Sequence, residues 1–165
     1  MNTITWPSKD IYFSKGVHFF FDEKKQYLIN IENYVIVDFK KENLKKIYNP
    51  SWILSFPGKR FIIISDKHLI PLANYFYRKF SCVVAVIENK DALKSLFNYF
   101  KHGHLEVRRS VRLSDREYFS LNLFIKEYSM RNQAEKLGVN IKTAYTFRAK
   151  TAKKMKLSRL IDIFR

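Results

Sequence analysis

The sequence is poor in the residues that mark secreted, membrane-spanning or flexible chains. Its 165 residues include a single cysteine, Cys82, which excludes an internal disulfide and is typical of a reducing compartment. Only four glycines and four prolines occur, and no low-complexity segment is visible. No apolar run approaches the roughly 20 residues that a membrane span needs, and residues 1–6 lack the pattern of a secretory signal. We therefore expect a cytoplasmic protein without a membrane partner.

Acidic residues are scarce as well. The chain has 15 Asp and Glu against 31 Lys and Arg, which gives a net charge of +16. The excess is concentrated at the C-terminal end, with a net +10 in residues 101–165 and +6 in residues 1–100. Such a balance indicates a polyanionic partner.

A catalytic constellation is also missing from the sequence. Ser, His and acidic residues are scattered, and no glycine-rich loop could cradle a phosphate. His102 and His104 flank Gly103 without a Cys or acid at ligand spacing, which is more typical of a loop than of a metal site. The sequence thus predicts a binding protein and not an enzyme, with no metal or other cofactor.

Three helix starts stand out between Leu113 and Leu157. Ser114 can cap a first helix, and Glu117 three residues later completes a capping box. Ser129 can cap a second helix, and Asn140 can cap a third that runs to about residue 155.

The third of these helices follows a sharp turn and carries charge of one sign. Gly138 lies in the turn, where a Cβ would be costly. Between residues 140 and 156 there is no acid, and the basic residues are Lys142, Arg148, Lys150, Lys153, Lys154 and Lys156. A short glycine-containing turn followed by a basic helix is the pattern of a helix-turn-helix. The alternative is a solvated basic face, which the caps and the turn glycine make less favourable.

This stretch resembles the helix-turn-helix of the LuxR/FixJ family of bacterial transcription regulators. The residues that match the family pattern, without a gap, are Leu113, Ser114, Arg116, Glu117, Leu121, Ala134, Leu137, Val139, Thr143, Lys154, Met155 and Leu157. The chain departs from the pattern at Glu127, where the family has Gly, at Met130, where it has Asn, and at Gln133, where it has an apolar residue. Residues 144–148 also differ, and Arg148 replaces a residue that is usually apolar. Despite these departures we expect the helix-turn-helix fold. Which DNA bases it recognises stays open.

The resemblance implies which residues contact DNA. By family position Tyr145, Thr146 and Ala149 face the bases, although a surface aromatic without a role is the alternative for Tyr145. Phosphate contacts are expected from Arg131, Lys142, Thr143, Lys150 and Lys153. Phe147 is expected to pack inward.

A last helix is predicted at residues 158–164. In the LuxR/FixJ family the corresponding helix joins two subunits, which implies dimerisation through Leu160, Ile161 and Phe164. Alternatively these residues close the core of their own domain, and the two uses can coexist.

The first hundred residues alternate apolar strands with amphipathic stretches. Strands are predicted at residues 4–6, 27–31, 34–39, 60–65 and 82–87, and helices at 10–21, 42–48, 68–79 and 91–102, the last with Leu93, Leu96 and Phe100 on one face. Continuously apolar strands separated by helices favour a parallel sheet covered on both faces.

This half resembles, more weakly, the receiver domain of response regulators. Asp38 ends a strand where receivers keep the phosphorylated Asp, and Ser65 ends the next strand where they keep Ser or Thr. The acid pair that holds Mg²⁺ is replaced by Ser8 and Lys9, and the position of the receiver lysine falls near Glu88, with Lys90 two residues on. We therefore expect a truncated, degenerate receiver with a structural Asp38 paired with Lys9 or Lys90; phosphorylation of Asp38 is the alternative.

These observations predict three segments. Residues 1–104 form a degenerate receiver-like α/β domain and residues 105–112 a linker with Arg108, Arg109 and Arg112, which could also contact phosphates. Residues 113–165 form an all-α, four-helix LuxR-type helix-turn-helix domain. The predicted function is a nucleoid-associated transcription regulator that binds double-stranded promoter DNA as a homodimer, independently of phosphorylation. The alternative is an auxiliary protein that heterodimerises with another LuxR-type regulator without reading a DNA site itself.

Overall fold

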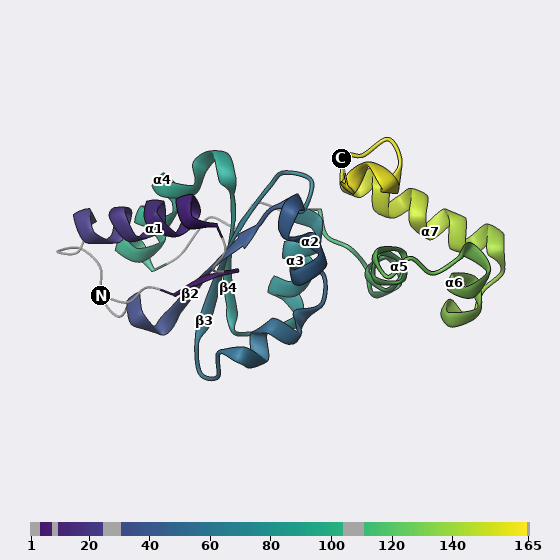
Figure 1. The fold of residues 1–165 in the computed structure, drawn as a ribbon, viewed down its shortest axis with the longest axis horizontal. Helices are drawn as coiled ribbons and strands as arrows, with labels where there is room; N and C mark the ends of the chain where they lie inside the picture. The colour runs from purple at the N-terminus through teal and green to yellow at the C-terminus, as the bar shows by residue number, and fades with distance from the viewer. Residues whose placement is uncertain (1–3, 8–9, 25–30, 104–110, 165) are drawn as a thin grey trace.

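The computed structural model describes residues 4–7, 10–24, 31–103 and 111–164, which form an α/β unit followed by a helical unit (Figure 1). The α/β unit contains four strands, β1 (Ile4–Trp6), β2 (Tyr34–Phe39), β3 (Arg60–Ser65) and β4 (Val83–Glu88). All neighbours pair in parallel, in the order β1-β2-β3-β4. The predicted parallel sheet is confirmed. Of the strand predicted at 27–31, residues 27–30 lie outside the described residues, and Ile31 begins a 3-10 turn.

Helices cover both faces of the sheet, which explains why its strands are apolar on both sides. One face lies under α1 (Ile11–Lys24) and α4 (Ala92–His102), and its core includes Ile36, Ile62 and Ile64. Shorter elements and α3 cover the other face: η3 (Lys41–Asn43), α2 (Leu44–Ile47), η4 (Pro50–Ser55) and α3 (Ile70–Lys79). Two further 3-10 turns are η2 (Ile31–Asn33) and η5 (Asn89–Asp91). Of the residues predicted on one face of α4, Leu96 is buried, whereas Leu93 in the first turn is 58% exposed.

The connections between the strands have an uncommon handedness. From β1 to β2 and from β2 to β3 the chain moves in the same direction across the sheet, but α1 lies on one face and α2 on the other. Two such crossovers must have opposite hands. The β3–α3–β4 crossover uses the same face as β2–α2–β3, so β1–α1–β2 has the hand opposite to the other two, whereas about 98% of such units share the right-handed form. A doubly wound sheet that had lost one strand and one helix after α1 would have this arrangement.

The helical unit begins each of its three α-helices at a predicted cap. They are α5 (Asp115–Ile125), α6 (Met130–Leu137) and α7 (Ile141–Lys154). Ser114 and Glu117 form the capping box, while Ser129 and Asn140 accept hydrogen bonds from backbone amides three residues on. Gly138 ends α6 at φ +65°, in the left-handed region that favours glycine. These cap predictions are confirmed. The predicted last helix is shorter, a 3-10 turn η6 (Leu160–Phe164).

The two units share one hydrophobic core. Leu113, Leu121 and Met155 of the helical unit lie in the same buried cluster as Phe39 and Phe76 of the α/β unit. The rings of Tyr75 on α3 and Tyr118 on α5 stack with centroids 4.3 Å apart. The backbone amide of Leu113 donates to the carbonyl of Pro71 at 3.1 Å, and His68 Nδ1 lies 2.8 Å from the carbonyl oxygen of Met155. The arrangement of the two units is therefore fixed by packing between described residues. Residues 104–110, which include Arg108 and Arg109 of the predicted linker, lie outside the described residues.

Candidate functional site

One side of α7 is exposed and carries the residues that the sequence assigned to DNA. We call it the outer face of α7, defined by Lys142, Tyr145, Thr146, Ala149, Lys150 and Lys153, all of which are exposed. Their spacing of three or four residues places them on one side of the helix. The opposite side is buried through Ala144, Thr151 and Ala152. Arg131 on α6 is exposed too, whereas Thr143 is half-buried and its backbone amide donates to the cap residue at 2.8 Å.

The charges of the outer face are not neutralised within the chain. In the residues that the structure describes, Lys142, Lys150 and Lys153 have no acidic side chain within ion-pair distance. Lys154, on the inner side, instead lies 2.6 Å from Glu117. Burial works to raise the pKa of Glu117, but the hydrogen bonds from Lys154 and from Ser114 hold it below its usual value. The outer face therefore offers three lysines to an external anion.

Two residues near the start of α7 differ in what they can offer to a ligand. Tyr145 is 58% exposed, so its phenol can act as donor or acceptor at a surface. The Thr146 hydroxyl donates to the carbonyl of Lys142 at 3.1 Å and is used within the helix. Its methyl group is what remains for an apolar contact.

Arg148 does not belong to the outer face, although the sequence counts it with the basic residues of this helix. The side chain is half-buried, and its Nε donates to Gln133 Oε1 at 3.0 Å. Burial lowers the pKa of Arg148 from its ordinary value. Phe147, two turns inside the helix, is partly buried against the α6–α7 core, as predicted.

The predicted dimerisation residues are divided between surface and core. Leu160 is only 5% exposed and lies in the core shared by the two units, together with Ile163, a residue that the prediction omitted. Ile161 and Phe164 are 45% and 43% exposed, and the ring of Phe164 stacks on Phe124 with centroids 5.7 Å apart. Only part of the predicted set is thus available to another subunit.

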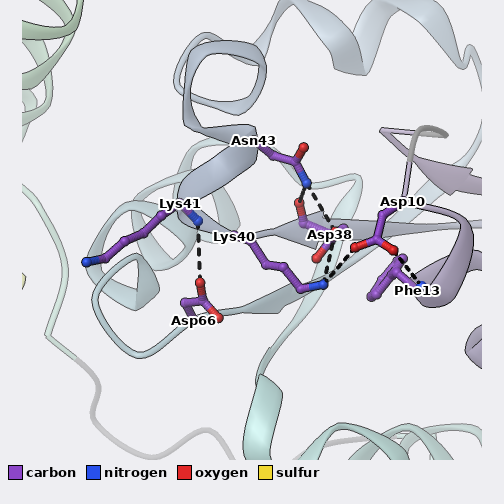
Figure 2. A network of polar contacts seen from close by, with 7 residues as sticks. All are labelled: Asp10, Phe13, Asp38, Lys40, Lys41, Asn43 and Asp66. Carbon is purple, nitrogen blue, oxygen red and sulfur yellow. Dashed lines mark hydrogen bonds and ion pairs between the residues drawn. The ribbon is translucent and has the colours of Figure 1, made fainter. Parts of the chain in front are cut away.

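The carboxyl edge of the sheet holds a compact charged cluster around Asp38 (Figure 2). Asp38 is 1% exposed, and its Oδ2 accepts a hydrogen bond from Asn43 Nδ2 at 3.1 Å. Lys40 Nζ lies 3.5 Å from Asp38 Oδ2 and 3.0 Å from Asp10 Oδ2, so it bridges the two carboxylates. Asp38 Oδ1 is buried and accepts no hydrogen bond from a described residue. Burial raises the pKa of Asp38 to about 6, against the opposing effect of Lys40.

Among the described residues Lys40 is the cation that pairs with Asp38, so the prediction of Lys90 was wrong and that of Lys9 stays untested. The prediction named Lys9 or Lys90, but Lys90 pairs with Glu88 at 3.7 Å, and Ser8 and Lys9 lie outside the described residues. Lys40 follows Asp38 by two residues, and the turn that begins η3 is what bends its side chain back over the edge of the sheet. Its ammonium lies between the carboxylates of Asp10 and Asp38. In the described ranges no group of three or more His, Cys, Asp or Glu side chains could bind one.

Comparison with known families identifies the first part of the chain. Residues 1–105 match the EcpR N-terminal domain. The chain belongs to the EcpR N-terminal domain family. This match covers the whole α/β unit and ends before the helical unit begins.

Two curated relatives extend the similarity to the helical unit. The uncharacterized protein YqeH of Escherichia coli K12 is 26% identical over 159 residues, which cover 91% of this chain and 74% of that protein. The Vi polysaccharide biosynthesis protein TviA of Salmonella typhi is 25% identical over 156 residues, covering 90% of this chain and 87% of TviA.

The fold of this member of the EcpR N-terminal domain family is similar to that of RcsB. A structure of two RcsB dimers bound to two parallel DNAs aligns with a TM-score of 0.51 at 14% identity, and covers 98% of this chain and 94% of RcsB. The likeness is one of fold, a four-stranded parallel sheet with helices. Among the described residues, no helix has the length and apolar character that crossing a membrane requires.

Proposed function

We propose that the chain is a bacterial transcription regulator that binds double-stranded promoter DNA through a LuxR-type helix-turn-helix formed by α6 and α7. The observation that carries the proposal is the outer face of α7, where Lys142, Lys150 and Lys153 have no acidic partner in the described part of the chain. A set of unpaired lysines along one exposed helix face fits the regularly spaced phosphates of a duplex. Similarity to RcsB, of which DNA-bound structures exist, supports the same class of ligand.

In this proposal α7 lies in the major groove with its N-terminal half toward the bases. Tyr145 would hydrogen-bond to a base edge, and the methyl groups of Thr146 and Ala149 would contact thymine methyls. Phosphate contacts would come from Arg131, Lys142, Thr143, Lys150 and Lys153. The DNA partner would place the protein at the nucleoid, and two copies would double the length of the site that is read.

The test begins with the purified protein alone, because no operator is assumed. Genomic fragments that the protein retains would be sequenced, and fluorescence anisotropy would compare the selected site with random DNA of the same length. We expect the selected site to bind at least about 10³-fold more tightly than random DNA. Retention of DNA without any preferred sequence would contradict site-specific regulation.

The second candidate is an auxiliary protein that heterodimerises with another LuxR-type regulator and reads no site itself. The exposed apolar residues Ile161 and Phe164 at the end of the chain favour this reading, because they offer a contact surface without any base-reading group. Sequence-specific binding by the protein alone would exclude it. Specific binding that requires the second regulator would favour it.

A further inference from the structure

Two residues that depart from the LuxR/FixJ pattern contact each other. Gln133 on α6 is fully buried, and its Nε2 donates to the carbonyl of Tyr128 at 2.7 Å. Its Oε1 accepts the hydrogen bond from Arg148 Nε on α7 at 3.0 Å. Arg148 therefore supplies the donor and Gln133 the acceptor of one buried hydrogen bond. This polar contact replaces the apolar contact that the family pattern leads us to expect between α6 and α7.

The guanidinium of Arg148 also contacts α5. Its central carbon lies 4.7 Å from the centre of the Phe124 ring, in the geometry of a cation–π contact. Phe124 in turn stacks on Phe164 of η6. One side chain of α7 is thus held by the two helices packed beneath it, and through Phe124 it is linked to the end of the chain.

The direction of Arg148 separates it from the phosphate-binding lysines. Two residues along a helix correspond to a rotation of about 200°, so Arg148 and Lys150 point to nearly opposite sides of α7. Lys150 is exposed, whereas Arg148 is half-buried. A guanidinium engaged with Gln133 and Phe124 is not free to extend to the DNA backbone on the other side of the helix.

We propose that Arg148 is a positioning residue for DNA reading: through Gln133 and Phe124 it fixes the rotation of α7 about its axis and thereby aims Tyr145 at the bases, without contacting a phosphate itself. The inference rests on the proposed function of α7. Rotation of a helix moves all its side chains together. Long lysine side chains can follow such a shift and keep their phosphates, whereas the short, directional contacts of Tyr145 and Thr146 cannot. Loss of the Arg148 anchor should therefore reduce specificity more than general affinity.

The experiment is a double-mutant cycle on the full chain with Arg148→Leu, Gln133→Leu and the combined variant. Affinity for the selected site and for random DNA is measured over a series of salt concentrations, and thermal melting is followed by circular dichroism. Each single change leaves a buried polar group without its partner, and should lower the preference for the selected site by about tenfold, within the range of coupled neighbours. The double variant has an apolar pair in place of the Arg148–Gln133 bond and should regain most of that preference; the Tyr128 carbonyl, which loses the Gln133 donor in Gln133→Leu and in the double variant alike, accounts for the remainder. The salt slope should stay as in wild type throughout.

Lys150→Met is the matched control, a neighbouring basic residue of α7 on the outer face. It should weaken binding to both DNAs in equal proportion, reduce the salt slope by about 0.9, and gain nothing from Gln133→Leu. Arg148→Lys is the control for loss of folding, because it keeps the charge and much of the length but loses the Nε donor and the planar guanidinium. It should melt near wild type and still lose specificity.

Three outcomes would overturn the inference. A lower salt slope for Arg148→Leu would make Arg148 a phosphate contact. Losses in the double variant equal to the sum of the single losses would show that Arg148 and Gln133 act separately. Wild-type specificity in Arg148→Lys would show that the geometry of the guanidinium is not needed to position α7. If wild type binds no DNA, the proposed function fails first; a coupling that is then seen in thermal melting alone would reduce Arg148 to a stabilising residue.

Discussion

At the carboxyl edge of the sheet, Lys40 lies 3.0 Å from Asp10 and 3.5 Å from Asp38, whereas the described chain offers Lys142, Lys150 and Lys153 on α7 no acid within ion-pair distance. The first region is the one that the sequence compared with a receiver's phosphorylation site, and its lysine is paired with two carboxylates of the same chain. The second region, the outer face of α7, has lysines without an acidic partner in the described part of the chain. A charged group that is paired inside a protein helps to hold the fold in one arrangement. Charged groups without a partner on a rigid surface attract a ligand of opposite charge. We therefore interpret the first region as structural, and the second is the one for which we propose binding.

The largest expected effect comes from removing the unpaired charge. Replacement of Lys142, Lys150 and Lys153 by Gln should lower DNA affinity on the order of 10³-fold near physiological salt and reduce the salt slope by about 2.7, because each lost phosphate contact removes about 0.9. Anisotropy titrations at several salt concentrations measure both. The control replaces three exposed lysines of the α/β unit, Lys15, Lys67 and Lys94, and removes the same charge. An equal loss in the control would mean that net charge, and not the outer face, carries the affinity.

Removal of the paired charge should act on stability instead. Lys40→Met leaves Asp38 buried without its cation, and breaking a buried pair on one side costs about 3 kcal/mol of unfolding free energy. Denaturant unfolding followed by circular dichroism measures this loss. The exposed Lys46 provides the control, because Lys46→Met should change stability by less than about 0.5 kcal/mol. A change in the DNA salt slope of Lys40→Met would place Lys40 at the DNA and break the contrast between the two regions.

The pH dependence of stability should report Asp38. Because its pKa is raised from 3.8 to about 6, the protonated form stabilises the fold fully below pH 3.8, and this contribution is lost as the pH rises through about 6. Relative to Asp38→Asn, wild type should gain about 1 kcal/mol of unfolding free energy between pH 7 and pH 5. The exposed Asp22 is the control, since Asp22→Asn should follow wild type. If wild type instead became less stable than Asp38→Asn as the pH falls, the pKa of Asp38 would be lowered in the folded protein. That result would contradict the conclusion that burial outweighs the effect of Lys40.

A backbone change can sharpen the comparison by stabilising the helical unit without touching its charged face. Glu127 follows α5 at φ +61°, in the left-handed region where the LuxR/FixJ pattern has Gly. Glu127→Gly should therefore raise the free energy of unfolding by about 0.5–1 kcal/mol, with DNA affinity unchanged. Glu127→Ala, which keeps a Cβ and removes only the exposed carboxylate, should bring no gain. A higher free energy of unfolding in Glu127→Ala would show that the loss of the carboxylate, and not the backbone conformation, causes the stabilisation.

The smallest expected effect is that of a phosphodonor. Since Lys40 already bridges Asp10 and Asp38, acetyl phosphate should leave the DNA affinity of wild type unchanged. Mass spectrometry of the treated protein should find no phosphate on Asp38. A donor-dependent rise in affinity that Asp38→Asn abolishes would restore Asp38 as a phosphoacceptor and remove the distinction between the two regions.

The sequence by itself determined the elements whose causes are local. Ser114, Ser129 and Asn140 start helices because each bonds to a backbone amide three residues away, and Gly138 ends one because the turn needs a positive φ. The parallel sheet followed from strands that are apolar on both faces. The exposure of Lys150 and its neighbours followed from helical periodicity.

Only the tertiary structure decided which side chains meet across the fold. The pairing of Arg148 with Gln133, and of Lys40 with Asp10, joins positions far apart in the chain, and no periodicity encodes such a pair. The same holds for Leu160, which the sequence left open between a contact with a second subunit and the core of its own domain, and which the core shared by the two units buries. A residue's hydrogen-bonding capacity is written in its chemistry, but the partner that satisfies it is selected by how the helices and the sheet pack.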